Sequence, residues 1–214
     1  MHPNPSFRRV EQAETLKFIW AHGFATLSIN GNNGPLLAHV PFWVDETATR
    51  VEAHLARSNP ILRAIKDAPQ KAVLSIMGPH SYISPDWYEI DDQVPTWNYV
   101  AAHLCGDLTI EPGESLPDHL NRLSNRFEDQ LEGPNWTMDK VDPEALNRML
   151  RMIVPISMSG ISIEATWKLG QNKDTQARQA AGQAVRDRGI GNGLSDLAEL
   201  MLTPPKDAPR DNAD

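Results

Sequence analysis

The sequence has only one cysteine, Cys105, among its 214 residues. A single cysteine cannot form a disulfide within the chain, and it cannot supply the several thiolates of a structural metal cluster. No stretch approaches the roughly 18 apolar residues that a membrane-spanning helix requires. The opening residues, MHPNPSFRRVEQ, lack the apolar core of a signal peptide. These absences predict a protein of the reducing cytoplasm, without a membrane partner.

The sequence also lacks an excess of positive charge. Its 20 Lys and Arg residues stand against 28 Asp and Glu residues, which gives a net charge of −8. Proteins that bind nucleic acid normally show a basic footprint, so direct DNA binding is disfavoured. The sequence contains no dinucleotide-binding GxGxxG after a strand, no P-loop, no HExxH and no GxSxG. No two of its seven His residues lie three or four positions apart, so we expect no metal site.

What is present is typical of a globular protein, with 40% hydrophobic and 22% charged residues. We expect one domain over residues 1–188, with a first helix near 10–22 and a helical insertion at about 115–151. Residues 189–214 are expected to form a short helix and a disordered tail.

Alternating apolar and polar residues predict six strands, at 24–30, 35–44, 51–56, 71–78, 96–111 and 153–166. The Pro-rich residues 79–95 are expected to form an ordered loop. Most strands follow one another without a crossover helix, which favours antiparallel pairing. The predicted fold class is therefore mainly β with inserted helices (α+β), closing as a small barrel.

Helical periodicity predicts which side chains face the core. In the first helix these are Leu16, Ile19 and Trp20. In a helix over residues 115–131 they are Leu116, Leu120, Leu123, Phe127 and Leu131, and in the helix that begins at Asp142-Pro143 they are Leu146, Met149 and Leu150.

Four local clusters are denser than a core requires. In the first, His54-Leu55-Ala56-Arg57-Ser58-Asn59-Pro60, a strand runs into a helix. The free backbone N–H groups of a helix start, together with Arg57 and the Ser58 hydroxyl, would suit a phosphate. A capped helix with a solvated Arg57 explains the same residues equally well.

The second cluster, residues 78–88, has three large aromatic side chains in a Pro-fixed loop, which is typical of a loop packed over the barrel. The third and fourth clusters combine aromatic and polar side chains. Trp97 and Tyr99 share one face of a strand with Asn98 opposite, an arrangement that suits either a planar ring or a packed core. Lys168, in the segment Trp167-Lys168-Leu169-Gly170-Gln171-Asn172, would face either an anion or the solvent.

Together these clusters resemble the PaiB-like, FMN-binding negative transcriptional regulators over residues 1–188. The shared motifs are His54-Leu55-Ala56-Arg57 with Asn59-Pro60, Gly78-Pro79-His80, Tyr82-Ile83-Ser84-Pro85, Trp87-Tyr88, Val94-Pro95-Thr96-Trp97-Asn98-Tyr99 and Trp167-Lys168-Leu169 with Gln171-Asn172. Three positions depart from the family pattern: Gly170 stands at a usual Ser, His2 at a usual Tyr, and Val154-Pro155 at a usual Val-Gly.

The resemblance implies a split β-barrel of the pyridoxamine-oxidase and flavin-reductase type, working as a homodimer with FMN at the interface. The residues that it implies for FMN are His39, His54, Ala56, Arg57, Ser58, Asn59, Trp97, Asn98, Tyr99, Lys168, Gln171 and Asn172. Among these, Arg57 suits the phosphate, and Lys168 would lie beside the pyrimidine edge, where a cation stabilises negative charge on a reduced flavin.

Other functions remain open on the sequence alone. The main alternative is an FMN-dependent oxidoreductase or reductase that acts on a small molecule, because this fold commonly hosts redox chemistry. A haem-binding barrel and a direct DNA-binding repressor are less favoured. The sequence identifies no catalytic residue, substrate or electron donor.

Overall fold

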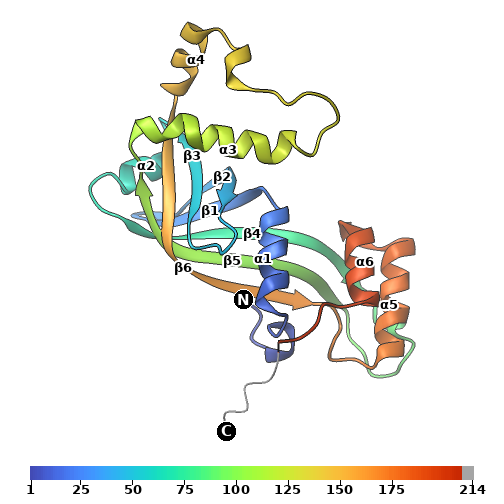
Figure 1. The fold of residues 1–214 in the computed structure, drawn as a ribbon. Coiled ribbons are helices and arrows are strands. Elements are labelled where there is room, and N and C mark those ends of the chain that lie inside the picture. Colours follow the sequence, from blue (N-terminus) through green and yellow to red (C-terminus); the bar gives the residue numbers. More distant parts are fainter. Residues whose placement is uncertain (209–214) are drawn as a thin grey trace. The chain divides into compact units, whose positions relative to one another are not determined.

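The computed structural model describes residues 1–208 (Figure 1). The strands of this part of the chain are β1 (Phe24–Gly31), β2 (Gly34–Val44), β3 (Val51–Ala56), β4 (Gln70–Ile83), β5 (Thr96–Ile110), β6 (Ile153–Lys168) and β7 (Ile190–Asn192). Its α-helices are α1 (Gln12–Ala21), α2 (Pro60–Ala64), α3 (Leu116–Glu128), α4 (Pro143–Leu150), α5 (Thr175–Arg188) and α6 (Leu194–Leu202). Short 3-10 turns lie at Pro5–Phe7, Pro85–Tyr88, Gly113–Ser115 and Met138–Lys140.

Two compact units divide the chain. Unit 1 contains Met1–Ala21, Ile76–His103 and the described residues from Glu164 onward, and unit 2 contains His22–Ser75 and Leu104–Ile163. The long strands β4, β5 and β6 therefore contribute residues to both units. The expected single domain over 1–188 stays a prediction.

The strands are hydrogen-bonded in the order β1-β2-β3-β6-β5-β4-β7, and β1 also pairs β4. Pairings β1–β2, β1–β4, β2–β3, β3–β6 and β4–β7 are antiparallel, as predicted. In unit 2, β1 pairs with β4 as well as with β2, and this pairing runs from Thr26 opposite Ser75 to Ile29 opposite Ala72. The predicted antiparallel arrangement is thus confirmed.

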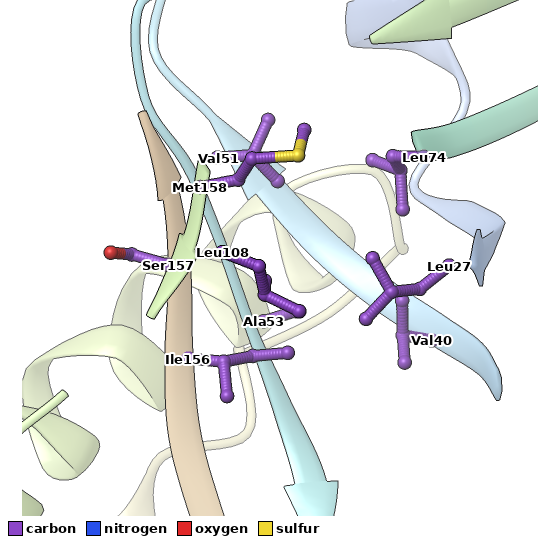
Figure 2. Close-up of a pocket in the computed structure, with 9 residues that line it drawn as sticks. All are labelled: Leu27, Val40, Val51, Ala53, Leu74, Leu108, Ile156, Ser157 and Met158. Carbon is purple, nitrogen blue, oxygen red and sulfur yellow. The ribbon is translucent and has the colours of Figure 1, made fainter. Parts of the chain in front are cut away.

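Apolar side chains fill the interior between the strands of unit 2. The residues that meet there are Leu27, Val40, Val51, Ala53, Leu74, Leu108, Ile156, Ser157 and Met158 (Figure 2). The space left among them is about 10 Å³, which is close to the least that holds one water molecule. The hydroxyl of Ser157 points away from this cluster and bonds the Glu111 carboxylate instead. A ligand of unit 2 must therefore bind outside this packed interior.

Helix α3 lies across β2 and β3 of unit 2 (Figure 1). Its buried residues are Leu116, His119, Leu123 and Arg126, whereas Phe127 and Leu131 are exposed. Leu116 and Leu123 are buried as predicted and Leu120 is half-buried, whereas the prediction was wrong for Phe127 and Leu131. The cause is polar: Arg126 donates a hydrogen bond to the carbonyl oxygen of Phe42, and His119 contacts the end of β3.

Helix α4 was wrongly predicted to turn Leu146, Met149 and Leu150 inward. The Asp142 side chain caps it by accepting a hydrogen bond from the N–H of Ala145, as its Asp-Pro start suggests. None of its residues is buried, and the helix stands away from the strands of its unit (Figure 1). Leu146 and Leu150 are half-buried and Met149 is exposed, so the apolar side of α4 is only partly covered within the described chain.

In unit 1, helices α5 and α6 lie side by side (Figure 1). Small residues of α5, including Ala177 and Ala181, pack in the core together with Leu197 and Met201 of α6. Arg178 joins the two helices by donating hydrogen bonds to the carbonyl oxygens of Met201 and Leu202. The short predicted helix near 195–202 is thus a packed part of unit 1.

Three further sequence predictions for unit 1 need correction or comment. Trp20, expected to face the core from the first helix, is 50% exposed, whereas Phe18 and Ile19 are buried. Strand β4 continues to Ile83, so the expected loop at 79–95 begins later. In the expected tail, Asp207 forms a bridge with Val10, and residues 209–214 lie outside the described residues.

Candidate functional site

The predicted cofactor residues are divided between the two units. His39, His54, Ala56, Arg57, Ser58 and Asn59 belong to unit 2, whereas Trp97, Asn98, Tyr99, Lys168, Gln171 and Asn172 belong to unit 1. Each unit therefore presents its own candidate site, and each is described by itself.

In unit 2 the turn after β3 fixes the direction of Arg57. The N–H of Arg57 donates to the Met152 carbonyl at 2.8 Å. Its side chain donates through Nε to the Arg151 carbonyl at 2.6 Å and through Nη2 to the Ile153 carbonyl at 3.2 Å. The guanidinium is thus oriented by the backbone and carries no carboxylate within salt-bridge distance in the described chain.

Arg57 lines a cleft of about 430 Å³ in unit 2. The cleft lies between the end of β5, the start of α3, the end of α4 and the start of β6. Its apolar lining includes Ile110, Leu116 and Leu150, and Arg151 adds a second guanidinium. Apolar walls with two arginines suit a ligand that joins an apolar body to an anionic group.

The start of α2 offers less to an anion than its sequence suggests. Asn59 caps the helix, because its side chain accepts a hydrogen bond from the N–H of Ile61 at 2.9 Å. Pro60 has no N–H, and the N–H of Leu62 donates to the Asn59 carbonyl. Of the two interpretations of this segment, a phosphate site or a capped helix, the structure shows the cap for Asn59. The exposed Ser58 hydroxyl, beside Arg57, is in no hydrogen bond with another described residue.

His54 points away from the Arg57 turn and meets His119 of α3. His54 Nδ1 and His119 Nε2 are 3.2 Å apart, and the two rings meet edge to face. Glu52 lies on the other side of His119, with 3.6 Å between Glu52 Oε2 and His119 Nδ1, and it forms a salt bridge with Arg122. The sequence could have indicated that His119 is buried, because His119 follows Leu116 by three residues and so lies on the same helix face.

Burial and the charge of His54 lower the pKa of His119 to about 4. Burial also lowers the pKa of His54. Both imidazoles are therefore neutral near pH 7, and one can donate a hydrogen bond to the other.

His39 has a separate environment on β2. Its Nδ1 lies 3.1 Å from the Thr26 hydroxyl, and its ring stacks on Phe24 at 6.3 Å between centroids. Ala56 is exposed at the end of β3. Neither residue lines the cleft of Arg57.

In unit 1 three of the predicted residues come together. Asn98, Lys168 and Asn172 line a pocket of about 280 Å³, with Phe7 and Tyr88 among its other walls. The Lys168 ammonium donates to the Thr96 hydroxyl and lies 5.9 Å from the centroid of the Phe7 ring. Burial lowers the pKa of Lys168.

Gln171 has a structural task in the turn after β6. Its side chain accepts from the N–H of Leu169 at 2.8 Å and donates to the Trp167 carbonyl. Gly170, where the family pattern has Ser, sits in this turn at φ +83°, a conformation that favours glycine. The turn that positions Lys168 is thus held by Gln171 and Gly170.

Trp97 and Tyr99 do not line the unit 1 pocket. Trp97 is 46% exposed and belongs to an aromatic cluster, with ring centroids 6.1 Å from His80 and 6.2 Å from Tyr82. Tyr99 is half-buried on the same strand. Asn98 lies on the opposite side, as the strand alternation predicted, and this is the side that is buried.

Residues 1–208 offer neither a group of metal ligands nor a membrane-spanning helix. No three or more His, Cys, Asp or Glu side chains are grouped so that they could hold a metal ion. No helix in this part of the chain is long and apolar enough to cross a membrane.

Comparison with known sequences identifies relatives along most of the chain. The model of a family described as "Putative FMN-binding domain" matches residues 1–161. Protease synthase and sporulation protein PAI 2 of Bacillus subtilis is 29% identical over 201 residues, which cover 92% of this chain and 95% of that protein. An uncharacterised protein of Aspergillus fumigatus is 23% identical over 224 residues, covering 81% of this chain and 86% of that one.

Two solved structures have a similar fold. The FAD- and haem-binding protein of Mycobacterium smegmatis aligns with a TM-score of 0.55 at 14% identity, covering 86% of this chain and 81% of that chain. Flavocytochrome Anf3 of Azotobacter vinelandii aligns with a TM-score of 0.55 at 16% identity, covering 79% of this chain and 73% of that chain. At these identities the likeness concerns the fold alone. The predicted fold class, a split β-barrel with inserted helices, is confirmed.

Proposed function

Because this chain belongs to the PaiB-like, FMN-binding domain family, we propose that it is an FMN-binding protein whose Arg57 turn holds the flavin phosphate. The observation that carries the proposal is the oriented guanidinium of Arg57 at the 430 Å³ cleft of unit 2. Two backbone carbonyls hold the guanidinium in place, so little side-chain freedom is lost when an anion binds.

The side chains around Arg57 fit a phosphate ester with an apolar body. Arg57 and Arg151 line the cleft and supply positive charge. Glu111, the acid in the lining, is already occupied by Arg50 at 2.8 Å and by the Ser157 hydroxyl. The hydrogen bond from Ser157 is the main reason that the pKa of Glu111 is lowered. The cleft therefore presents a net positive end to a phosphate.

FMN, when bound, supplies one- and two-electron redox chemistry. The residues of unit 2 bind and orient the phosphate, and the apolar lining excludes water from the body of the ligand. The net charge of −8 disfavours direct contact with DNA phosphates, so we place any regulatory role in the flavin site and not in a DNA-binding surface.

We also propose that the protein works as a homodimer. Large apolar side chains of the helical insertion are exposed in the single chain, namely Leu131, Trp136, Met149 and Met152. Large apolar side chains that are exposed in one chain are typical of an interface between subunits when they gather on one surface. Helix α4, which has no buried residue, is the element that a second chain would cover.

The phosphate assignment can be tested by comparing FMN with riboflavin, which lacks the phosphate. Arg57→Ala should weaken FMN binding by about 1.5–3 kcal/mol, the scale of a hydrogen bond to a charged group. Riboflavin binding should change little, and Arg57→Lys should recover part of the loss. Flavin fluorescence titrations measure all of these affinities.

The matched control is Arg63→Ala, because Arg63 lies on the neighbouring α2 and does not line the cleft. Arg57 also bonds two carbonyls, so the melting temperature of each variant must be measured alongside. Equal losses for FMN and riboflavin in a folded Arg57→Ala protein would contradict the phosphate assignment.

A further inference from the structure

The geometry of unit 1 points to a second ligand site. We propose that the pocket at Lys168 and Lys173, here called the two-lysine pocket, binds a small carboxylate that also carries a hydroxyl group. None of its lining residues lines the Arg57 cleft of unit 2, so the proposal goes beyond the binding of the FMN phosphate.

The two-lysine pocket has a volume of about 280 Å³ and is built entirely from unit 1. The N-terminal arm, the segment after the Pro85–Tyr88 turn, the start of β5 and the turn after β6 all contribute to its walls. Pockets for drug-sized ligands begin at roughly 300 Å³, so this pocket suits a smaller molecule. Phe7 and Tyr88 supply apolar walls.

Two ammonium groups face this small space. Lys168 donates to the Thr96 hydroxyl, and Lys173 donates to the side-chain oxygen of Gln93. Each ammonium also lies over an aromatic ring, Lys168 over Phe7 and Lys173 over Tyr88 at 5.4 Å. Within the described chain, neither lysine has a carboxylate within 4.0 Å.

Neutral oxygens and aromatic faces compensate only part of the cost of burying a charge. Burial lowers the pKa of Lys168, as expected for an ammonium that lacks an anionic partner. The other ionisable groups on the pocket are His2, Tyr88 and Asp92. Burial first, and then the charge of Lys168, lower the pKa of His2, which disfavours its cationic form. Asp92 supplies one carboxylate against the two ammonium groups. The pocket therefore carries a positive surplus that an anion would neutralise.

A second and independent feature is the amide of Asn98. Asn98 is only 1% exposed, and its Oδ1 has no hydrogen-bond partner in the described chain. Its side chain also hydrogen-bonds Tyr88, and its Nδ2 donates to the sulfur of Met201 at 3.6 Å, which is a weak acceptor. A buried acceptor without a donor is costly, and a ligand hydroxyl would satisfy it.

The two features together define the ligand. The positive charge of the pocket favours a ligand with a carboxylate. The unpaired Asn98 oxygen favours a ligand with a hydrogen-bond donor, and the small volume favours a ligand with few atoms. Neither the lysines nor Asn98 alone would distinguish such a ligand from a simple anion. A hydroxy-carboxylate meets all three requirements.

Isothermal titration of the full chain with 4-hydroxybenzoate, benzoate and phenol tests both features. These probes carry the carboxylate and the hydroxyl, the carboxylate alone, and the hydroxyl alone. We expect 4-hydroxybenzoate to bind about fivefold more tightly than benzoate, because one more hydrogen bond forms, and phenol to bind least. Absence of 4-hydroxybenzoate binding would overturn the proposal.

Variants then assign the binding to this pocket. Lys168→Met should weaken 4-hydroxybenzoate by about 10- to 100-fold, since it removes a charged donor. Lys17→Met is the matched control, because Lys17 is an exposed lysine of unit 1 on α1, and it should change nothing. Asn98→Leu should remove the preference for 4-hydroxybenzoate over benzoate while benzoate still binds.

Competition separates this site from the flavin site. Saturation with FMN should leave the affinity for 4-hydroxybenzoate unchanged, and Arg57→Ala should not affect it either. Displacement of 4-hydroxybenzoate by FMN would assign the pocket to the flavin and overturn the proposal. Equal losses from Lys168→Met and Lys17→Met would overturn it as well. If Arg57→Ala leaves FMN binding intact while the probes behave as expected, only the phosphate assignment fails.

Discussion

The contact between His54 and His119 predicts that the stability of the protein falls as the pH drops below 7. The imidazole of His119 is 2% exposed and packs between His54 and Glu52. In the unfolded chain its pKa is 6.5, whereas in the folded protein burial and His54 lower it to about 4. Arg122, which also faces His119, acts in the same direction, and Glu52 opposes it.

The sign follows from proton binding. Between pH 6.5 and about 4 the unfolded chain holds a proton on His119 and the folded protein does not, so acid favours unfolding. The contribution is fully present above pH 6.5 and is lost progressively down to about pH 4. For these two pKa values the free energy of unfolding falls by about 2 kcal/mol between pH 7 and pH 5 from this one group.

Urea denaturation followed by circular dichroism, at half-unit steps from pH 8 to pH 5, measures this loss. The comparison variant is His119→Gln, which keeps a neutral amide that can reach His54 but does not titrate. The variant should be less stable than the wild type at pH 7. The difference between the two proteins should shrink by about 2 kcal/mol by pH 5.

Parallel stability curves for the wild type and His119→Gln would refute the reasoning. Such a result would mean that His119 has the same pKa in both states, and that the neutral pair with His54 is not maintained. His54, whose pKa burial also lowers, still titrates in the variant and adds the same slope to both curves.

Two further predictions concern the turn after β6 and the oligomeric state. Gly170→Ser should lower the free energy of unfolding by about 1–2 kcal/mol, because residue 170 has a φ of +83°. The control Gly113→Ser, at a position with open space and an ordinary φ, should leave the free energy of unfolding nearly unchanged in the same urea titration. Light scattering at micromolar concentration should give twice the 23.8 kDa mass of one chain, and a wild-type mass of one chain would contradict the dimer. The double variant Met149→Glu, Met152→Glu should shift the protein toward the monomer, because both side chains are exposed on the helical insertion.

Local signals in the sequence were sufficient for most of the secondary structure. Strand alternation predicted β5 to within one residue at its end, and the helix starts at Asn59-Pro60 and Asp142-Pro143 are observed with the expected side-chain caps. These features depend on neighbouring residues, so one sequence carries the information. The clusters that resemble the PaiB-like family likewise consist of short contiguous motifs, and the family was recognised from them.

Local signals were weaker where a strand or helix has two plausible faces. Residues Leu116, Leu120, Leu123 and Phe127 match helical periodicity as well as the buried set that contains His119 and Arg126. The choice between the two faces is made by the polar groups on the neighbouring strands, which the helix meets only in the folded chain. The sequence therefore predicted the helix and its buried Leu116 and Leu123 correctly, but it missed His119 and Arg126.

Only the tertiary structure decided which polar groups meet. His54 and His119 are 65 positions apart, and Lys168 and Thr96 are 72 positions apart. No periodicity or spacing rule connects residues at such separations, because chain reversals between strands bring them together. The same holds for the orphaned oxygen of Asn98. The alternation of β5 predicts that this residue lies opposite Trp97 and Tyr99, but its burial and the absence of a donor beside its oxygen depend on every element packed around that position.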